Sequence, residues 1–508
     1  MDDILPYNQA KDAITIKEKV GQFFMPAAFI NDTEEEIKKT ENLITRFHIG
    51  SICFFHSRAS AATNYEGKKE VLYNARSLHK LKELIKRYQS ASKYPLLIAI
   101  DAEWGLAMRI EETPQYPYAL TLGAIHDYNL IQKVGESIGQ DCKNAGIHWN
   151  LCPSVDINNN PNNPVIGYRS FGDNPKDVYQ KSKAFIEGMS KSGILNSIKH
   201  FPGHGDTETD SHLGLPRIEK SKHELLQNEL YPFKNLIKYG IDSVMVGHLA
   251  VPSIGMHKTK SSTVSKPIIT ELLRNEFGHS GVIISDALNM HSVSKLHKEK
   301  GQLEFEAFEA GNDVLCFAEN TEEGISKIYE KISTQRIEKS FRRIWELKEK
   351  AFSFTKELTP HSYDNLMLEL AKNTITFFKG SKIELKTFFE SGFDLIEIGN
   401  QKKSIFASLL EIEKNIKNKK VIAIFPREMK PINNFGLTNK EINYTNKLLE
   451  NEECIIYLFG NPYSLNLFKH NKAKAIVLVY QDFEIFQKNA ANHLQGNVLA
   501  KGILPVKL

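Results

Sequence analysis

The first 340 residues alternate between helical patterns and short apolar strand patterns, and this alternation restricts the fold more than any other feature of the chain. The segments between strands carry apolar residues at helical spacing, beginning with 16–25 and 34–47. Helices that alternate with buried strands indicate βαβ units in a parallel sheet. About seven or eight such units fit a TIM-type (β/α)8 barrel. Strands are expected at 49–55, 94–100, 147–153, 194–199, 243–246 and 282–285.

An open, doubly wound sheet is the alternative α/β fold, but no Gly-x-Gly-x-x-Gly motif follows a strand here. We therefore predict a barrel catalytic domain over 1–350, a linker over 351–365 and a smaller α/β sandwich domain over 366–508. The second domain shows no phosphate loop, Gly-x-Ser-x-Gly elbow or metal motif. Its expected role is structural or in specificity.

Composition excludes several classes of function. A net charge of +4 over 508 residues is too small to predict nucleic acid as a partner. The five widely spaced cysteines are expected to be reduced packing residues. The first residues show no basic segment followed by an apolar one, and no later run approaches a membrane span. We expect a cytoplasmic protein for the chain as written, and a periplasmic or secreted one if a leader has been trimmed.

Polar residues follow most of the predicted barrel strands. In a barrel, the carboxyl ends of the strands meet at one rim, where active sites are built, so these residues predict a polar pocket. Asp286 is the strongest candidate, because an acid that closes an apolar strand has no solvated face to explain it. Alternatives stay open for three others: Asp156 as a turn cap, Glu103 as a helix-start carboxylate and His248 as a core histidine. The residues are Asp101, Glu103, Asp156, Lys199, His200, His248 and Asp286.

The segment from Lys199 to Pro216 is the densest cluster of ionisable groups and is expected to be an active-site loop. Its proline and glycines exclude a regular helix. Asp210 and His212 are two residues apart, a spacing that suits a carboxylate that orients an imidazole. A polar loop without chemistry is one alternative. A zinc site is another, although its spacing fits no known zinc motif; its ligands would come from His200, His204, His212, Asp206 and Asp210.

A carboxylate nucleophile and a separate proton donor are what retaining glycoside hydrolysis requires. The motifs that carry both resemble glycoside hydrolase family 3, in particular its β-N-acetylglucosaminidases. The similarity runs from about Lys17 to Val506. Its motifs are Asp101-Ala102-Glu103-Trp104-Gly105, Asn158 to Pro164, Arg169-Ser170-Phe171-Gly172, Lys199-His200-Phe201-Pro202-Gly203-His204-Gly205, Asp210-Ser211-His212, Ser285-Asp286-Ala287-Leu288 and Ala310-Gly311-Asn312-Asp313.

The resemblance implies roles for seven residues. Asp286 would be the nucleophile, and His212 the general acid/base, oriented by Asp210. An imidazole suits that role because its ordinary pKa lies near neutrality, and a neighbouring carboxylate raises it. The residues that would bind the terminal sugar are Asp101, Arg169, Lys199 and His200. Two positions depart from the family pattern: Trp104 replaces a glycine, and Ala287 replaces a second acid after the nucleophile.

The resemblance also implies a retaining, exo-acting hydrolase that removes terminal β-linked N-acetylglucosamine, with muropeptides of the cell wall as natural substrate and a small carbohydrate as its partner. It implies no cofactor and no metal. Within the family, a β-N-acetylglucosaminide phosphorylase or a β-glucosidase is the alternative, since an imidazole does not repel phosphate as a carboxylate would. Outside the enzyme class, the alternative is a catalytically inactive sugar-binding protein.

Overall fold

The computed structural model describes residues 4–56, 73–208, 214–255, 259–356, 362–400, 402–410 and 418–508. The chain divides into two compact units. Unit 1 comprises Met1–Tyr116, Val134–Asp156 and Ser182–Pro360, and unit 2 comprises Pro117–Lys133, Ile157–Lys181 and His361–Leu508. Two stretches that precede the predicted linker therefore belong to the second unit.

Parallel strands in unit 1 close into a barrel, as predicted. Strands β2 to β8 form one sheet in chain order. Strand β1 pairs with β9, and a bridge between Ile284 and Val314 joins β8 to β9, which closes the ring. The strands are β1 (Phe24–Met25), β2 (Ala27–Phe29), β3 (Ser51–Phe55), β4 (Leu97–Ile100), β5 (Trp149–Asn150), β6 (Leu195–Phe201), β7 (Ser243–Val246), β8 (Val282–Ser285) and β9 (Leu315–Cys316).

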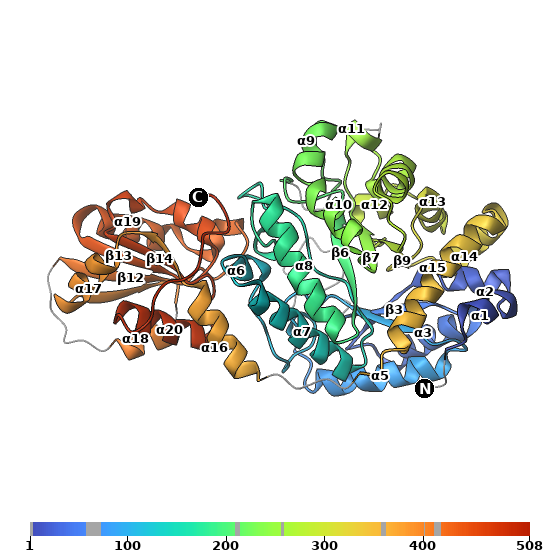
Figure 1. The fold of residues 1–508 in the computed structure, drawn as a ribbon, viewed down its shortest axis with the longest axis horizontal. Helices are drawn as coiled ribbons and strands as arrows, with labels where there is room; N and C mark the ends of the chain where they lie inside the picture. The colour runs from blue at the N-terminus through green and yellow to red at the C-terminus, as the bar shows by residue number, and fades with distance from the viewer. Residues whose placement is uncertain are drawn as a thin grey trace. The chain divides into compact units, whose positions relative to one another are not determined.

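Helices follow most of these strands and surround them (Figure 1). Three begin with a capping box, in which the N-cap residue and the glutamate three positions later satisfy each other's backbone N–H groups: Thr15 with Glu18, Thr33 with Glu36, and Ser221 with Glu224. Helices α7 (Tyr128–Ala145) and α8 (Pro175–Lys191) contain residues of both units. The other helices of unit 1 are α1 (Tyr7–Ala13), α2 (Ile16–Gly21), α3 (Glu34–Phe47), α5 (Ser77–Ala91), α9 (Lys222–Gln227), α10 (Leu230–Tyr239), α11 (Pro252–Gly255), η4 (Pro267–Glu276), α12 (His291–Ser294), α13 (Gln302–Ala310), α14 (Thr321–Lys331) and α15 (Thr334–Phe352).

The first barrel strand corrects the prediction of a helix over 16–25. Helix α2 ends at Gly21, where a Cβ would lie 1.8 Å from the backbone oxygen of Phe47, so only glycine allows this approach of α2 to the end of α3. The chain then continues as β1 and β2, which are separated by Pro26 because proline has no N–H for the ladder. The prediction is wrong because the apolar run 23–30 suits a buried strand as well as a helix.

Unit 2 contains a five-stranded sheet in the order β10-β14-β13-β12-β11, in which only the edge strand β10 is antiparallel. Helix α20 packs against α16 and α18, and α19 packs against β13 (Figure 1). Within the described residues, no helix combines the length and the apolar character needed to cross a membrane. The elements are α16 (Tyr363–Thr374), β10 (Thr376–Lys379), α17 (Lys382–Glu390), β11 (Asp394–Ile398), α18 (Ile405–Leu409), β12 (Lys419–Ile424), α19 (Asn439–Asn451), β13 (Glu453–Leu458), β14 (Ala475–Leu478) and α20 (Glu484–Leu494).

Two stretches of the N-terminal half are bound into unit 2 by residues near position 505. Ile503 N donates to Ala124 O at 2.9 Å, and Asp173 N donates to Pro505 O at 3.0 Å. The Lys507 backbone N–H also donates to Asp173 Oδ2, at 2.7 Å. Stretches 117–133 and 157–181 are therefore built into the second unit by backbone hydrogen bonds.

Candidate active site

Four of the predicted site residues lie at the carboxyl ends of strands in unit 1. Asp101 follows β4, and Lys199 and His200 belong to the last residues of β6. Asp286 follows β8 directly. Because the strands are parallel, these ends form one rim of the barrel. The structure thus brings four predicted residues to the same rim.

Lys199 joins two carboxylates that follow β4. Its Nζ lies 2.7 Å from Asp101 Oδ1 and 2.7 Å from Glu103 Oε1. The Lys199 side chain is 2% exposed, so it cannot replace these partners with bulk water. Arg109 Nη2 binds the other oxygen of Asp101 at 3.0 Å. Two cations and two carboxylates therefore form a charge-balanced cluster, in which Glu103 is an ion-pair partner and not a helix cap.

The Asp101 carboxylate is held in its ionised form. Burial alone would raise the pKa of Asp101, but the nearby charges of Lys199 and Arg109 outweigh burial, so this pKa lies below its ordinary value. Sequence reasoning missed Arg109, which follows Asp101 by eight residues and does not lie at a strand end. An ionised Asp101 can accept hydrogen bonds from sugar hydroxyls, and Lys199 and Arg109 can supply charged donors.

Asp156 orients two histidines of the following strand and loop. Its Oδ2 lies 2.7 Å from His200 Nδ1, and its Oδ1 accepts the backbone N–H of His204 at 2.7 Å. Ser154 Oγ donates to the same carboxylate at 2.9 Å. The Asp156 side chain is fully buried, and burial would raise its pKa, but the charge and hydrogen bond of His200 hold that pKa below the ordinary value. Asp156 therefore positions His200 and is more than a turn cap.

His204 is a neutral histidine buried below the loop. Its Nδ1 lies 2.7 Å from Thr207 Oγ1. Burial first, and then the charge of His200, lower the pKa of His204 to about 4. Asp286 acts in the opposite direction on this pKa, so its carboxylate lies close enough to influence the ring. His204 is thus expected to be a buried, uncharged residue at neutral pH that bonds to Thr207 within the loop.

Asp286 is half-buried and is fixed by backbone hydrogen bonds. Its N–H donates to Val246 O at 2.9 Å, and its Oδ1 accepts the N–H of Ala287 at 2.8 Å. Cys53 and burial raise the pKa of the Cys316 thiol, and the charges of Asp101 and Asp286 raise it further. Both carboxylates therefore lie close enough to one buried thiol to influence it, in agreement with their positions after β4 and β8.

His248 is a core histidine whose two nitrogens both have partners, as in one of the alternatives considered from the sequence. Its Nδ1 lies 2.7 Å from Thr263 Oγ1, and its Nε2 lies 2.9 Å from Ala287 O. The residue is fully buried. His248 therefore contacts Ala287, the residue that follows Asp286.

Arg169 lies in unit 2, in the short helix η2 (Gly167–Arg169). Its Nη1 donates to Val165 O at 3.4 Å. Asn158 Nδ2 donates to Gly167 O at 3.2 Å, which holds the same loop from its beginning. The sugar-binding role of Arg169 stays a prediction.

Asp210 and His212 lie outside the described residues, so their roles also stay predictions. Lys220 follows these two residues in sequence and binds Asp206, which precedes them. Its Nζ lies 2.6 Å from Asp206 Oδ2 and 2.5 Å from Glu229 Oε1. The Ala250 N–H also donates to Pro216 O at 2.8 Å. Among the described residues, no group of three or more histidines, cysteines or carboxylates has the arrangement of a metal site.

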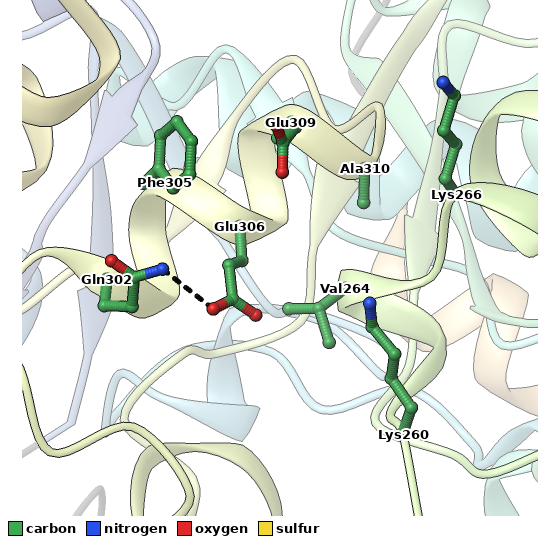
Figure 2. Close-up of a pocket in the computed structure, with 8 residues that line it drawn as sticks. All are labelled: Lys260, Val264, Lys266, Gln302, Phe305, Glu306, Glu309 and Ala310. Atoms are coloured by element: carbon green, nitrogen blue, oxygen red, sulfur yellow. Dashed lines mark hydrogen bonds between the residues drawn. The ribbon is translucent and has the colours of Figure 1, made fainter. Parts of the chain in front are cut away.

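A separate cleft of about 580 Å³ lies between α13 and residues 260–266 of unit 1 (Figure 2). Glu306 projects into it and accepts a hydrogen bond of 2.9 Å from Gln302. The lining residues are Lys260, Val264, Lys266, Gln302, Phe305, Glu306, Glu309 and Ala310. Among the described residues, none of those predicted for the active site lines this cleft, so it is distinct from the rim described above.

Comparison with known proteins agrees with the motifs. The glycosyl hydrolase family 3 N terminal domain matches residues 15–347. Beta-hexosaminidase A of Pseudoalteromonas piscicida is 35% identical over 287 residues, which are 54% of this chain and 46% of the relative. A beta-hexosaminidase of Neisseria meningitidis serogroup C (strain 053442) is 34% identical over 252 residues, 48% of this chain and 68% of the relative. The chain thus spans about half the length of the first relative.

Solved structures share the fold of almost the whole chain. A family 3 beta-N-acetylglucosaminidase from Paenibacillus sp. str. FPU-7 has a TM-score of 0.78 at 24% identity, and the match covers 97% of this chain and 99% of that one. A beta-glucoside phosphorylase has a TM-score of 0.79 at 21% identity, with coverage of 98% and 95%. These likenesses confirm the barrel followed by an α/β sandwich. Since the family domain covers more than half of the 508 residues, the chain belongs to glycosyl hydrolase family 3.

Proposed function

We propose that this protein is a retaining, exo-acting β-N-acetylglucosaminidase. The observation that carries the proposal is the position of Asp286, a half-buried carboxylate that closes β8 and is held by the Ala287 N–H. It lies on the rim that also carries the Asp101, Glu103, Arg109 and Lys199 cluster. A fixed carboxylate beside a dense set of hydrogen-bonding groups is what attack on a bound sugar requires.

The reaction proceeds in two displacements. In the first, an Asp286 oxygen bonds to the anomeric carbon while the bond to the leaving oxygen breaks, and His212 gives its proton to that oxygen. In the second, His212 takes a proton from water, the water oxygen bonds to the anomeric carbon, and Asp286 leaves as a carboxylate. The configuration at the anomeric carbon is retained because it is inverted twice.

The buried cluster on the rim suits the hydroxyls of the terminal sugar. Asp101 accepts hydrogen bonds, Lys199 donates them, and Asp156 holds His200 in one orientation through Nδ1. Arg169 joins them in the proposal, as the family motif implies. The preference for N-acetylglucosamine rests on relatives that are named beta-hexosaminidases. Muropeptides are the proposed natural substrate.

The test is release of p-nitrophenol from its β-N-acetylglucosaminide and its β-glucoside, with and without phosphate, with the sugar product identified. The proposal expects free N-acetylglucosamine in both buffers. A sugar 1-phosphate formed only with phosphate would establish the phosphorylase instead. Cleavage of the glucoside alone would overturn the N-acetyl preference, and binding of N-acetylglucosamine without cleavage of either compound would indicate a sugar-binding protein.

A further inference from the structure

His248 is a fully buried titratable residue that the proposed reaction does not use. It follows β7, two residues after Val246, and its ring lies between two other segments of the barrel. Nδ1 faces Thr263 Oγ1 at 2.7 Å, and Nε2 faces Ala287 O at 2.9 Å. A single imidazole therefore connects the loop after β7 to the residue that follows Asp286.

The partners of the ring determine where its proton lies. A backbone carbonyl can only accept, so the Nε2 atom carries the hydrogen and donates it to Ala287 O. In the neutral ring, Nδ1 is then an acceptor, and the Thr263 hydroxyl can donate to it. The fully buried Thr263 hydroxyl also lies 3.2 Å from Gly247 O and 3.4 Å from Val246 O, but Nδ1, at 2.7 Å, is the nearest of its partners. The order of donation is Thr263 to His248 to Ala287.

Both backbone groups of Ala287, the carbonyl and the N–H, form hydrogen bonds. Its carbonyl accepts from His248 and also from the N–H of Met290 at 3.1 Å. Its N–H donates to Asp286 Oδ1 at 2.8 Å. The Asp286 N–H in turn donates to Val246 O at 2.9 Å. Rotation of the Ala287 backbone would therefore move the N–H that fixes the Asp286 carboxylate.

We propose that His248 and Thr263 are positioning residues for the nucleophile. Through Ala287 they hold the Asp286 carboxylate in the orientation from which it attacks the anomeric carbon. The inference rests on the proposed function, since it takes Asp286 as the nucleophile. Small displacements of a reacting group lower rates steeply, by about a hundredfold for a shift of the order of 1 Å. The bonds of Thr263 and His248 lead through Ala287 to Asp286, so their loss should lower kcat more than it weakens sugar binding.

Val264 supplies a matched control for Thr263. The side chain of Val264 lines the cleft beside α13 (Figure 2), whereas the adjacent Thr263 directs its hydroxyl to His248. Both side chains are buried. Thr263→Val removes one hydroxyl with almost no change of shape, Thr263→Ser keeps the hydroxyl, and Val264→Ala removes buried carbon atoms from the same segment without touching His248.

The experiment measures kcat for the p-nitrophenyl N-acetylglucosaminide together with the inhibition constant of free N-acetylglucosamine. Thr263→Val is expected to lower kcat about tenfold, and His248→Leu about a hundredfold. His248→Gln, whose amide can donate near the Nε2 position, and Thr263→Ser should retain most of kcat. The inhibition constant should stay within about twofold of the wild-type value, because the side chains that bind the sugar are unchanged.

Equal losses of kcat in Thr263→Val and Val264→Ala would overturn the inference, because they would show a general effect on packing. So would an inhibition constant that rises in step with the loss of kcat. Nitrogen-15 NMR of the folded wild type, assigned with His248→Gln, tests the tautomer independently of turnover: an Nδ1–H ring would contradict it. If Asp286→Asn keeps full activity, Asp286 is not the nucleophile and the proposed function is rejected. If only the His248 and Thr263 variants keep full activity, the positioning role is rejected and the proposed function stands.

Discussion

Lys199 lies in β6 and Asp101 follows β4, yet the Lys199 ammonium lies 2.7 Å from the Asp101 carboxylate. Their side chains are only 2% and 15% exposed. An ion pair with so little access to water stabilises a fold only while both partners are present, because a single buried charge that loses its partner is strongly unfavourable. The two residues proposed to bind the sugar therefore also contribute to the stability of the barrel.

Lys199→Met should destabilise the protein by about 3–5 kcal/mol, because Asp101 and Glu103 would both lose their shared cation. Urea unfolding measures this change. Lys39→Met is a matched control, since its ion pair with Glu35 lies on the surface of α3 with side chains 69% and 78% exposed. A loss of stability no larger than in the control would contradict the buried-pair interpretation.

Asp286→Asn should lower kcat by about a thousandfold or more, because an amide cannot form the glycosyl-enzyme. The change is nearly isosteric, so thermal unfolding should stay close to that of the wild type. Release of p-nitrophenol measures the effect, and proton NMR of the first product of the wild type tests retention. An initial product with inverted configuration would exclude the two-step mechanism.

Asp156→Asn should lose stability mainly at neutral pH. The pKa of Asp156 is lower in the folded chain than its ordinary value near 3.9, so the wild-type contribution is fully present above about pH 4 and is lost as pH falls through the folded pKa. The difference in unfolding free energy between wild type and variant should therefore shrink below about pH 4. Urea titrations at pH 7 and pH 3.5 measure it. A difference that stays constant, or grows, in acid would be inconsistent with an ionised Asp156.

Lys220→Met should slow the cleavage of poor leaving groups more than that of p-nitrophenol. Lys220 binds both Asp206 and Glu229. Its loss removes the ion pair that holds Asp206, in the loop that carries the proposed acid/base. Protonation matters most when the leaving oxygen is a poor leaving group, such as the hydroxyl of a second sugar. Lys222→Met, which removes an exposed pair with Glu276, is the control. Equal slowing of both substrates would argue against a role in protonation.

Gly172→Ala should destabilise unit 2 by more than about 2 kcal/mol. The residue has φ +149°, and a Cβ would lie 2.4 Å from Pro505 O. Gly496→Ala is the control, because that glycine also has a positive φ, +81°, but a Cβ there meets nothing within 4 Å. Thermal unfolding of both variants measures the cost of the close approach. Similar losses in the two variants would show that only backbone conformation matters.

The fold was largely predictable because helix and strand patterns alternate through the first 340 residues. The prediction failed at residues 16–25, where a short apolar run fits either element and helix α2 ends at Gly21, beside Phe47 O. Strand β9 is not among the expected strands; it has only two residues, Leu315 and Cys316.

The site was less predictable than the fold. Strand ends identified Asp101, Lys199, His200 and Asp286, but partnerships across the chain are invisible to local patterns. Asp156 binds His200 from 44 residues away, so the sequence alone left a turn cap as an equal explanation. Arg109 follows a turn instead of a strand, and only its bond to Asp101 reveals it.

Asp173 can form its bonds to residues 505–507 only after those residues have been translated. A ribosome adds about 5–20 residues per second, so Pro505 follows Gly172 after roughly 15–70 s. During that interval, stretches 117–133 and 157–181 have been translated while their partners in unit 2 do not yet exist. Chaperone contacts with the nascent chain should therefore concentrate on these stretches until residues 503–507 have been added.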